Sequence, residues 1–167
     1  MSHPLVDQLR FARSEFVRCL EGVSEADARC HLGPMNCISW IVGHLANQEQ
    51  FLWVILGQDQ IVSPGLNDRV GHGMPASTPP LAEMWDVWHA VTQAADPFLD
   101  TLTAQRLQEH YVWQGRTLPE SIGTQLLRNT YHYWFHTGEG HAIRQQLGHP
   151  DLPQFVGDMS LAVYRLE

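Results

Sequence analysis

Residues 36–57 read NCISWIVGHLANQEQFLWVILG, and this stretch decides what kind of fold to expect. Its apolar residues cover most of the circumference of a helix, which is typical of a helix that is largely buried. Asn36 can cap the start of this helix and Gly57 can end it, so we predict a helix from about Asn36 to about Leu56. One histidine, His44, lies in the middle of this apolar stretch.

Three further helices are predicted from the spacing of apolar residues. The first begins at Pro4, a residue favoured in a first helical turn, and ends at Gly22. The third begins near Thr78, and Pro97 inside it should kink or split the helix. The fourth should span about residues 119–147, where a glycine and a proline follow it. The tail beyond it is expected to be extended or irregular and to pack on the helices.

The segment between the second and third helices is rich in glycine and proline. A connection of roughly twenty residues is uncommon unless topology or function requires it. Such a connection lets the second and third helices run parallel. We therefore predict an all-α fold, a four-helix bundle with a long crossover between helices 2 and 3, formed by residues 1–167 as a single domain. No alternating strand pattern competes with this interpretation.

The charge balance is acidic and argues against a nucleic-acid partner. The chain has 10 basic and 18 acidic residues, a net charge of −8, and no lysine. An acidic surface repels the phosphate backbone, so we expect no nucleic-acid binding. Hydrophobic residues make up 44% of the chain and charged residues only 17%, which is typical of a folded globular protein.

The cysteines and the N-terminus indicate a cytoplasmic protein. Cys19, Cys30 and Cys37 are odd in number and irregularly spaced, which favours reduced thiols over a disulfide framework. The N-terminus lacks the charged and apolar regions of a signal peptide. No run of eighteen apolar residues occurs, so we expect no membrane span and no membrane partner.

Among the histidines, His132 and His136 form a pair on the fourth predicted helix. They are four residues apart, so both rings point the same way. Sites in bundles are built from side chains on facing helices, and His44 could supply a third imidazole from the second. Three histidines would leave open positions on a metal, as catalytic sites do. On spacing alone, the pair could instead be solvated or part of a core hydrogen-bond network, and His44 an ordinary buried histidine.

Two stretches resemble the DinB-like (DinB/YfiT) family. They are SWIVGHLANQEQFLW, residues 39–53, and YHYWFHTGEGHAIRQQLGHPDLPQFVGD, residues 131–158. The resemblance implies a four-helix bundle whose metal site takes one histidine from helix 2 and an HxxxH pair from helix 4. Those positions correspond to His44, His132 and His136. Affinity order favours zinc or nickel as the divalent metal, with iron or manganese as alternatives.

Three further residues near these histidines are candidates for supporting roles. Glu139 lies on the face of His136 and could orient that ring or act as a catalytic base on an activated water. Glu49 is expected to be a carboxylate on the helix surface. Gln48, one turn after His44, could be aimed at the metal as a weak ligand.

The open three-histidine site predicts a metal-dependent enzyme that acts on a small molecule. The family resemblance implies either hydrolysis or transfer of a low-molecular-weight thiol. The alternative is a non-catalytic, stress-related protein that binds a metal or ligand, since no nucleophile or dedicated base is evident. A homodimer is possible. DNA association, suggested by the family's name alone, is disfavoured by the acidic charge balance.

Overall fold

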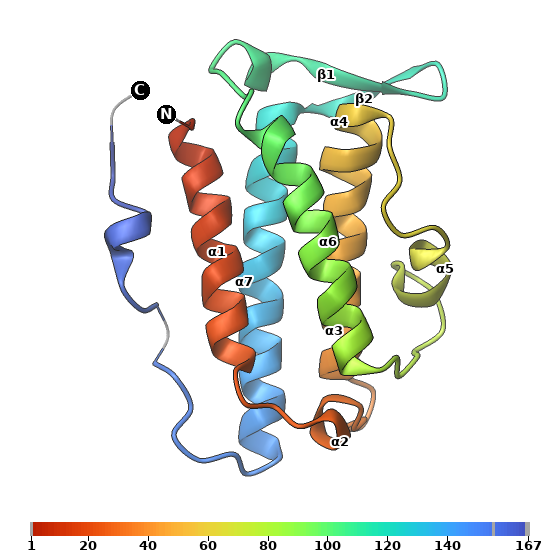
Figure 1. Cartoon of the computed structure of the whole chain (residues 1–167), viewed down its shortest axis with the longest axis vertical. Helices are drawn as coiled ribbons and strands as arrows, with labels where there is room; N and C mark the ends of the chain where they lie inside the picture. Colours follow the sequence, from red (N-terminus) through yellow and green to blue (C-terminus); the bar gives the residue numbers. More distant parts are fainter. Residues whose placement is uncertain (1, 155, 166–167) are drawn as a thin grey trace.

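The structure is a computed structural model that describes residues 2–154 and 156–165, and helices dominate it (Figure 1). The prediction of a mostly helical protein is confirmed. The helices and strands are α1 (Pro4–Leu20), α2 (Glu25–Ala28), α3 (Ile38–Glu49), the π-helix η1 (Gln50–Ile55), α4 (Leu56–Gln58), α5 (Leu66–Val70), α6 (Leu81–Leu99), η2 (Arg106–Gln108), β1 (His110–Trp113), β2 (Arg116–Ser121), α7 (Ile122–Gln146) and η3 (Met159–Leu161).

The four long helical segments are α1, α3 with η1, α6 and α7, and they lie side by side in Figure 1. Helix α1 packs against α7, and α3 packs against α6 and also contacts α7. After α4, the chain returns along one side of the molecule through α5 (Figure 1). Helix α6 therefore begins at the same end as α3. This arrangement brings the middle of α3 against the middle of α7, where the candidate histidines lie.

The core forms where these helices meet. Phe16 of α1 and Tyr133 of α7 are fully buried, and their rings pack edge to face with centroids 5.7 Å apart. Gly43 allows α3 to approach α6 and α5 closely. A Cβ added there would lie 2.5 Å from the Met84 sulfur, closer than atoms tolerate, and 3.2 Å from a Val70 methyl carbon, which is a tight contact.

Both ends of the second predicted helix differ from the prediction. The N-cap is Cys37, without a capping side-chain bond, so the prediction of Asn36 as the cap is wrong. The helical segment also continues past Gly57 to Gln58, and this glycine packs against the Phe98 ring, 3.0 Å from where a Cβ would be. Asp59, in the left-handed conformation with φ of 55°, ends the helix instead.

Helix α6 continues through Pro97 to Leu99, so the predicted split is wrong. A proline removes one main-chain hydrogen bond and crowds the carbonyl four residues earlier. At Pro97 this cost falls in the last turn, where the helix is about to end.

A β-hairpin between α6 and α7, which was not predicted, adds two short strands to the helical fold. Strands β1 and β2 pair antiparallel and are joined by Gln114 and Gly115. Both residues have positive φ, 50° and 76°, as a type I′ turn requires. Pro119 lies in β2, so α7 begins three residues later than predicted, at Ile122. Ser121 caps it by accepting a hydrogen bond from the main chain of Thr124.

The C-terminal tail packs on α1, as predicted. Arg18 donates to the Gln154 carbonyl at 2.7 Å, the Gly157 N–H donates to Glu15 at 2.8 Å, and Gln8 donates to the Ala162 carbonyl at 3.0 Å. Among the described residues, no helix has the length and apolar character needed to cross a bilayer.

Candidate metal centre

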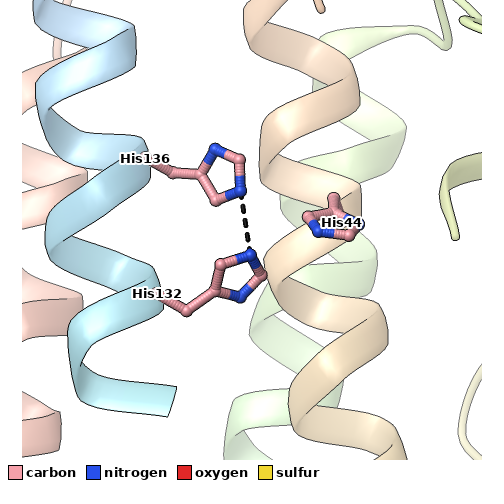
Figure 2. A group of neighbouring side chains, drawn as sticks. All are labelled: His44, His132 and His136. Carbon is pink, nitrogen blue, oxygen red and sulfur yellow. Dashed lines mark hydrogen bonds between the residues drawn. The ribbon is translucent and has the colours of Figure 1, made fainter. Parts of the chain in front are cut away.

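The rings of His44, His132 and His136 meet between α3 and α7 (Figure 2). One ligand nitrogen from each ring lies within 4.8 Å of the other two. The Nε2 atoms of His132 and His136 are only 2.9 Å apart. His44 and His136 are buried, and His132 is half-buried.

The local structure of the two helices fixes these rings. His132 and His136 are one turn apart on α7, so they project side by side toward α3. On α3, the Trp40 indole stacks on the His44 ring, with centroids 4.4 Å apart and planes at 16°. This stacking limits rotation of His44 and directs the edge of its ring toward α7.

In each imidazole the Nδ1 nitrogen, here called the outer nitrogen, faces an oxygen atom. His44 Nδ1 lies 2.8 Å from the Val70 carbonyl, His132 Nδ1 lies 2.7 Å from Gln48 Oε1, and His136 Nδ1 lies 2.7 Å from Glu139 Oε2. A carbonyl or an ionised carboxylate can only accept a hydrogen bond. The Nδ1 atoms of His44 and His136 therefore carry their hydrogens.

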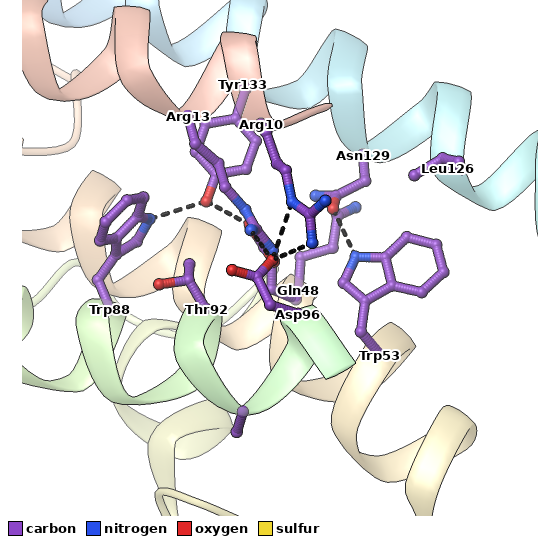
Figure 3. Close-up of polar contacts among 12 residues, drawn as sticks. Arg10, Arg13, Gln48, Trp53, Trp88, Thr92, Asp96, Leu126, Asn129 and Tyr133 are labelled. Carbon is purple, nitrogen blue, oxygen red and sulfur yellow. Dashed lines mark hydrogen bonds and ion pairs between the residues drawn. The ribbon is translucent and has the colours of Figure 1, made fainter. Parts of the chain in front are cut away.

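A chain of hydrogen bonds fixes the same tautomer at His132. The indole N–H of Trp53 can only donate, so Asn129 Oδ1, 2.8 Å away, accepts (Figure 3). The Asn129 amide nitrogen then donates to Gln48 Oε1 at 2.8 Å. Because that oxygen accepts, His132 Nδ1 donates to it and carries the hydrogen. Trp53 and Asn129, both fully buried, thus determine which nitrogen of His132 is free.

With Nδ1 protonated, each neutral ring presents a bare lone pair on Nε2. His132 and His136 then place two acceptors 2.9 Å apart with no hydrogen between them. A positive charge shared by the two nitrogens would relieve this contact. A proton would leave an imidazolium beside two other rings in a largely buried site, whereas a metal ion could bind all three lone pairs.

The acid–base properties of the rings fit metal binding. Burial lowers the pKa of His44 to about 4, and the nearby His136 adds to this effect against the opposing bond to Val70. Burial, His136 and His44 lower the pKa of His132 to about 3. Both rings are therefore neutral at pH 7, the form in which imidazole binds metals.

The number of donors and the spacing of the His132–His136 pair also fit a divalent ion. Two imidazole nitrogens on one metal at about 2.1 Å lie roughly 3.0–3.4 Å apart when the angle between them is 90–109°. The 2.9 Å separation between the Nε2 atoms of His132 and His136 is close to that range. Three protein ligands would leave positions open for a small molecule, as in catalytic metal sites.

The chain matches one known protein family. A model of the DinB superfamily matches residues 8–139. The chain belongs to the DinB superfamily. The matched segment contains all three histidines and Glu139. No curated protein matches the chain.

In this DinB-superfamily chain, Glu139 and Gln48 contact the rings from outside the cluster. Glu139 holds His136 through Nδ1, on the side of the ring away from His132, which is a positioning contact. The role of Glu139 as a base stays a prediction. Gln48 was a candidate ligand, but its amide oxygen is bonded to Asn129 and His132. Its contact is therefore with a histidine and not with the centre of the cluster.

The prediction of Glu49 as a surface carboxylate is wrong. Glu49 is fully buried and ion-paired with Arg13, whose Nε donates to it at 2.7 Å. The Tyr133 hydroxyl donates to the same carboxylate at 2.6 Å and accepts from Trp88 at 2.8 Å. Figure 3 shows Arg13, Tyr133 and Trp88 converging, with Asp96 beside them. An ionised carboxylate is tolerated here because the guanidinium and the hydroxyl satisfy it.

Sequence reasoning missed two parts of the site. The Val70 carbonyl comes from α5, in the long connection between α4 and α6, and a main-chain group leaves no signal in the residue type. His72, from the same segment, lines a cleft together with His44 and His132. The length of the crossover was the available signal, because long connections are often functional.

Proposed function

We propose that the chain binds one divalent metal ion through His44, His132 and His136. The observation that carries this proposal is that the Nε2 lone pairs of the three rings converge, while the Nδ1 atom of each ring is hydrogen-bonded to an oxygen atom. Zinc or nickel is the proposed ion, with iron or manganese as alternatives, since imidazole suits each of them. The proposal includes the family's bundle topology, in which the long crossover supplies the Val70 carbonyl to His44.

We further propose that the protein is a metal-dependent enzyme, either a hydrolase or a low-molecular-weight thiol transferase. A bound divalent ion would lower the pKa of a water or thiol that it ligates. The chain would contribute the fixed histidines, the orientation of His136 by Glu139, and the adjacent cleft that receives the substrate. The alternative is a non-catalytic protein that binds a metal or ligand, and it would use the same histidines.

Elemental analysis of untagged protein, purified without a nickel column, tests the metal proposal. We expect about one divalent ion per chain in the wild type and none in His44→Ala. Asn47→Ala is a matched control on the same helix, outside the histidine cluster. A wild type without metal, or unchanged metal content in His44→Ala, would contradict the proposal.

Activity assays distinguish the proposed enzyme function from the non-catalytic alternative. The assay offers cysteine or glutathione with 1-chloro-2,4-dinitrobenzene for thiol transfer, and p-nitrophenyl acetate for hydrolysis. We expect a rate above background in at least one assay, lost in His132→Ala. A metal-loaded protein that is inactive across thiols and esters would favour the non-catalytic alternative.

A further inference from the structure

A large cleft opens beside the three histidines. Its volume is about 1270 Å³, and its walls come from α3 and η1, the crossover segment, and α7. Ligand pockets for drug-sized molecules usually measure about 300–1,000 Å³. The cleft can therefore hold such a molecule next to a small reactant at the histidines.

The cleft extends along α7. Its lining on this helix runs from Thr124 to Phe135 and includes His132. Eight residues separate Thr124 from His132 on one helix, which corresponds to about 12 Å. Most of the exposed lining surface is apolar, and Phe51 and Leu127 contribute to it.

The charges around the cleft indicate a neutral occupant. No Asp or Glu is among the described residues that line it, so a cationic ligand would find no carboxylate partner. The one guanidinium, Arg128, is already paired with Glu120. An anionic ligand would have to compete with that carboxylate for the guanidinium.

The wall formed by the crossover segment is held in place. The Gln50 side chain accepts hydrogen bonds from the main chain of Val62 at 3.0 Å and of Ser63 at 2.6 Å, and it donates to the Ser63 carbonyl at 3.0 Å. Asn47 donates to Asn67 at 3.1 Å farther along the same wall. Gln50 begins the π-helix η1, a type of distortion that is frequent at functional sites. The cleft is thus formed before a ligand arrives.

Two exposed aromatic residues line the cleft next to the histidines. Tyr131 precedes His132 and is 63% exposed, and Phe135 precedes His136 and is 69% exposed. Clustered apolar exposure of this kind marks binding surfaces. Because both residues line a cavity that continues to the histidines, the occupant that fits is a small molecule that enters the cavity.

We propose that this cleft binds a neutral, largely apolar small molecule, with its apolar body against Phe51, Leu127, Tyr131 and Phe135 and its reactive end at the histidines. The assignment of this molecule as the substrate rests on the proposed metal-dependent function. The binding site itself does not depend on the metal, because the lining side chains come from the protein alone.

Fluorescence titration with N-phenyl-1-naphthylamine, a neutral apolar probe, tests the proposal on the full chain after chelator treatment. We expect saturable binding to the wild type and at least tenfold weaker binding to Tyr131→Ser/Phe135→Ser and to Leu127→Asp. The matched control is Val163→Ser/Tyr164→Ser, which removes two exposed apolar residues outside the cleft and should bind like the wild type.

Three results would overturn the proposal. In the first, the probe does not bind saturably to the wild type. In the second, it binds the Tyr131→Ser/Phe135→Ser variant as tightly as the wild type. In the third, the wild type is a dimer, and this variant is a monomer that still binds the probe as the wild type does. In the last case the aromatic residues would be an interface between two copies. His136→Ala, at a proposed metal ligand outside the cleft lining, separates this proposal from the metal proposal: we expect it to lose metal and retain the probe. If the wild type binds the probe but contains no metal, the cleft proposal is retained and the metal proposal alone is contradicted.

Discussion

Two polar clusters lie on adjacent residues of the same two helices and differ in how they are satisfied. Glu49 and Tyr133 belong to the buried network with Arg13, where the carboxylate is bonded by both the guanidinium and the hydroxyl. Their sequence neighbours Gln48 and His132 belong to the histidine cluster, where the inner lone pairs face one another. A buried polar network whose groups all have partners stabilises the fold, whereas a cluster whose lone pairs face a cleft is suited to binding.

The largest loss of stability should come from breaking the buried ion pair between Glu49 and Arg13. Glu49→Ala would remove the buried partner of the Arg13 guanidinium and leave it only the half-exposed Asp96, and breaking a buried ion pair costs about 3–5 kcal/mol. Chemical denaturation would measure the free energy of unfolding, with His136→Ala as the comparison. An equal or larger loss in His136→Ala would mean that the histidine cluster is as structural as the buried network.

The second-largest effect should be a loss of metal affinity when Gln48 is replaced. Gln48→Leu removes the acceptor that holds the His132 Nδ1–H, and loss of such an outer contact typically weakens metal binding about 10–100-fold. Gln48→Glu keeps acceptor oxygens for both His132 and Asn129 and should retain most of the affinity. Competition with a colorimetric chelator gives both values. If Gln48→Glu lost as much affinity as Gln48→Leu, the orientation of His132 by this residue would be refuted.

The third effect is the pH dependence of the metal-free protein. Folding lowers the pKa of His44 to about 4 and of His132 to about 3, so below pH 6.5 the unfolded chain binds protons that the folded chain does not. Stability should therefore fall as the pH decreases from about 6.5 to 4, by up to about 1.4 kcal/mol per pH unit for each histidine. His44→Gln/His132→Gln should flatten this slope. An unchanged slope in that variant would assign the acid sensitivity to other groups.

The smallest effect should follow from an exposed ion pair. Arg69 donates to Glu83 at 2.6 Å, with both side chains more than 40% exposed. Exposed pairs contribute about 0–1 kcal/mol, so Arg69→Gln should change the free energy of unfolding far less than Glu49→Ala does. A loss comparable with that of Glu49→Ala would show that burial does not distinguish the two pairs.

The sequence allowed the long helices and the His132–His136 pair to be predicted, because helical periodicity and the four-residue spacing are local properties. His44 was different. Its position in an apolar helix also suits an ordinary core residue, and only the family resemblance joined it to the pair. The structure then placed all three rings together.

The missed features depend on contacts between distant segments. Glu49 follows the polar residues Asn47 and Gln48 and resembles a surface residue, because the partner that buries it, Arg13, is 36 residues away. The hairpin was missed because its strands are short, although Gly115 at its turn was a usable local signal. The π-helix has no evident sequence signature.

Isothermal titration of the metal-free protein with zinc tests the central claim most directly. The wild type should bind one ion per chain, and His44→Ala, His132→Ala and His136→Ala should each bind at least about 100-fold more weakly, since direct ligands matter more than the residues that orient them. Glu49→Gln, where it is folded, should bind zinc like the wild type. A wild type that takes up no zinc, or histidine variants that bind it as tightly, would contradict the account.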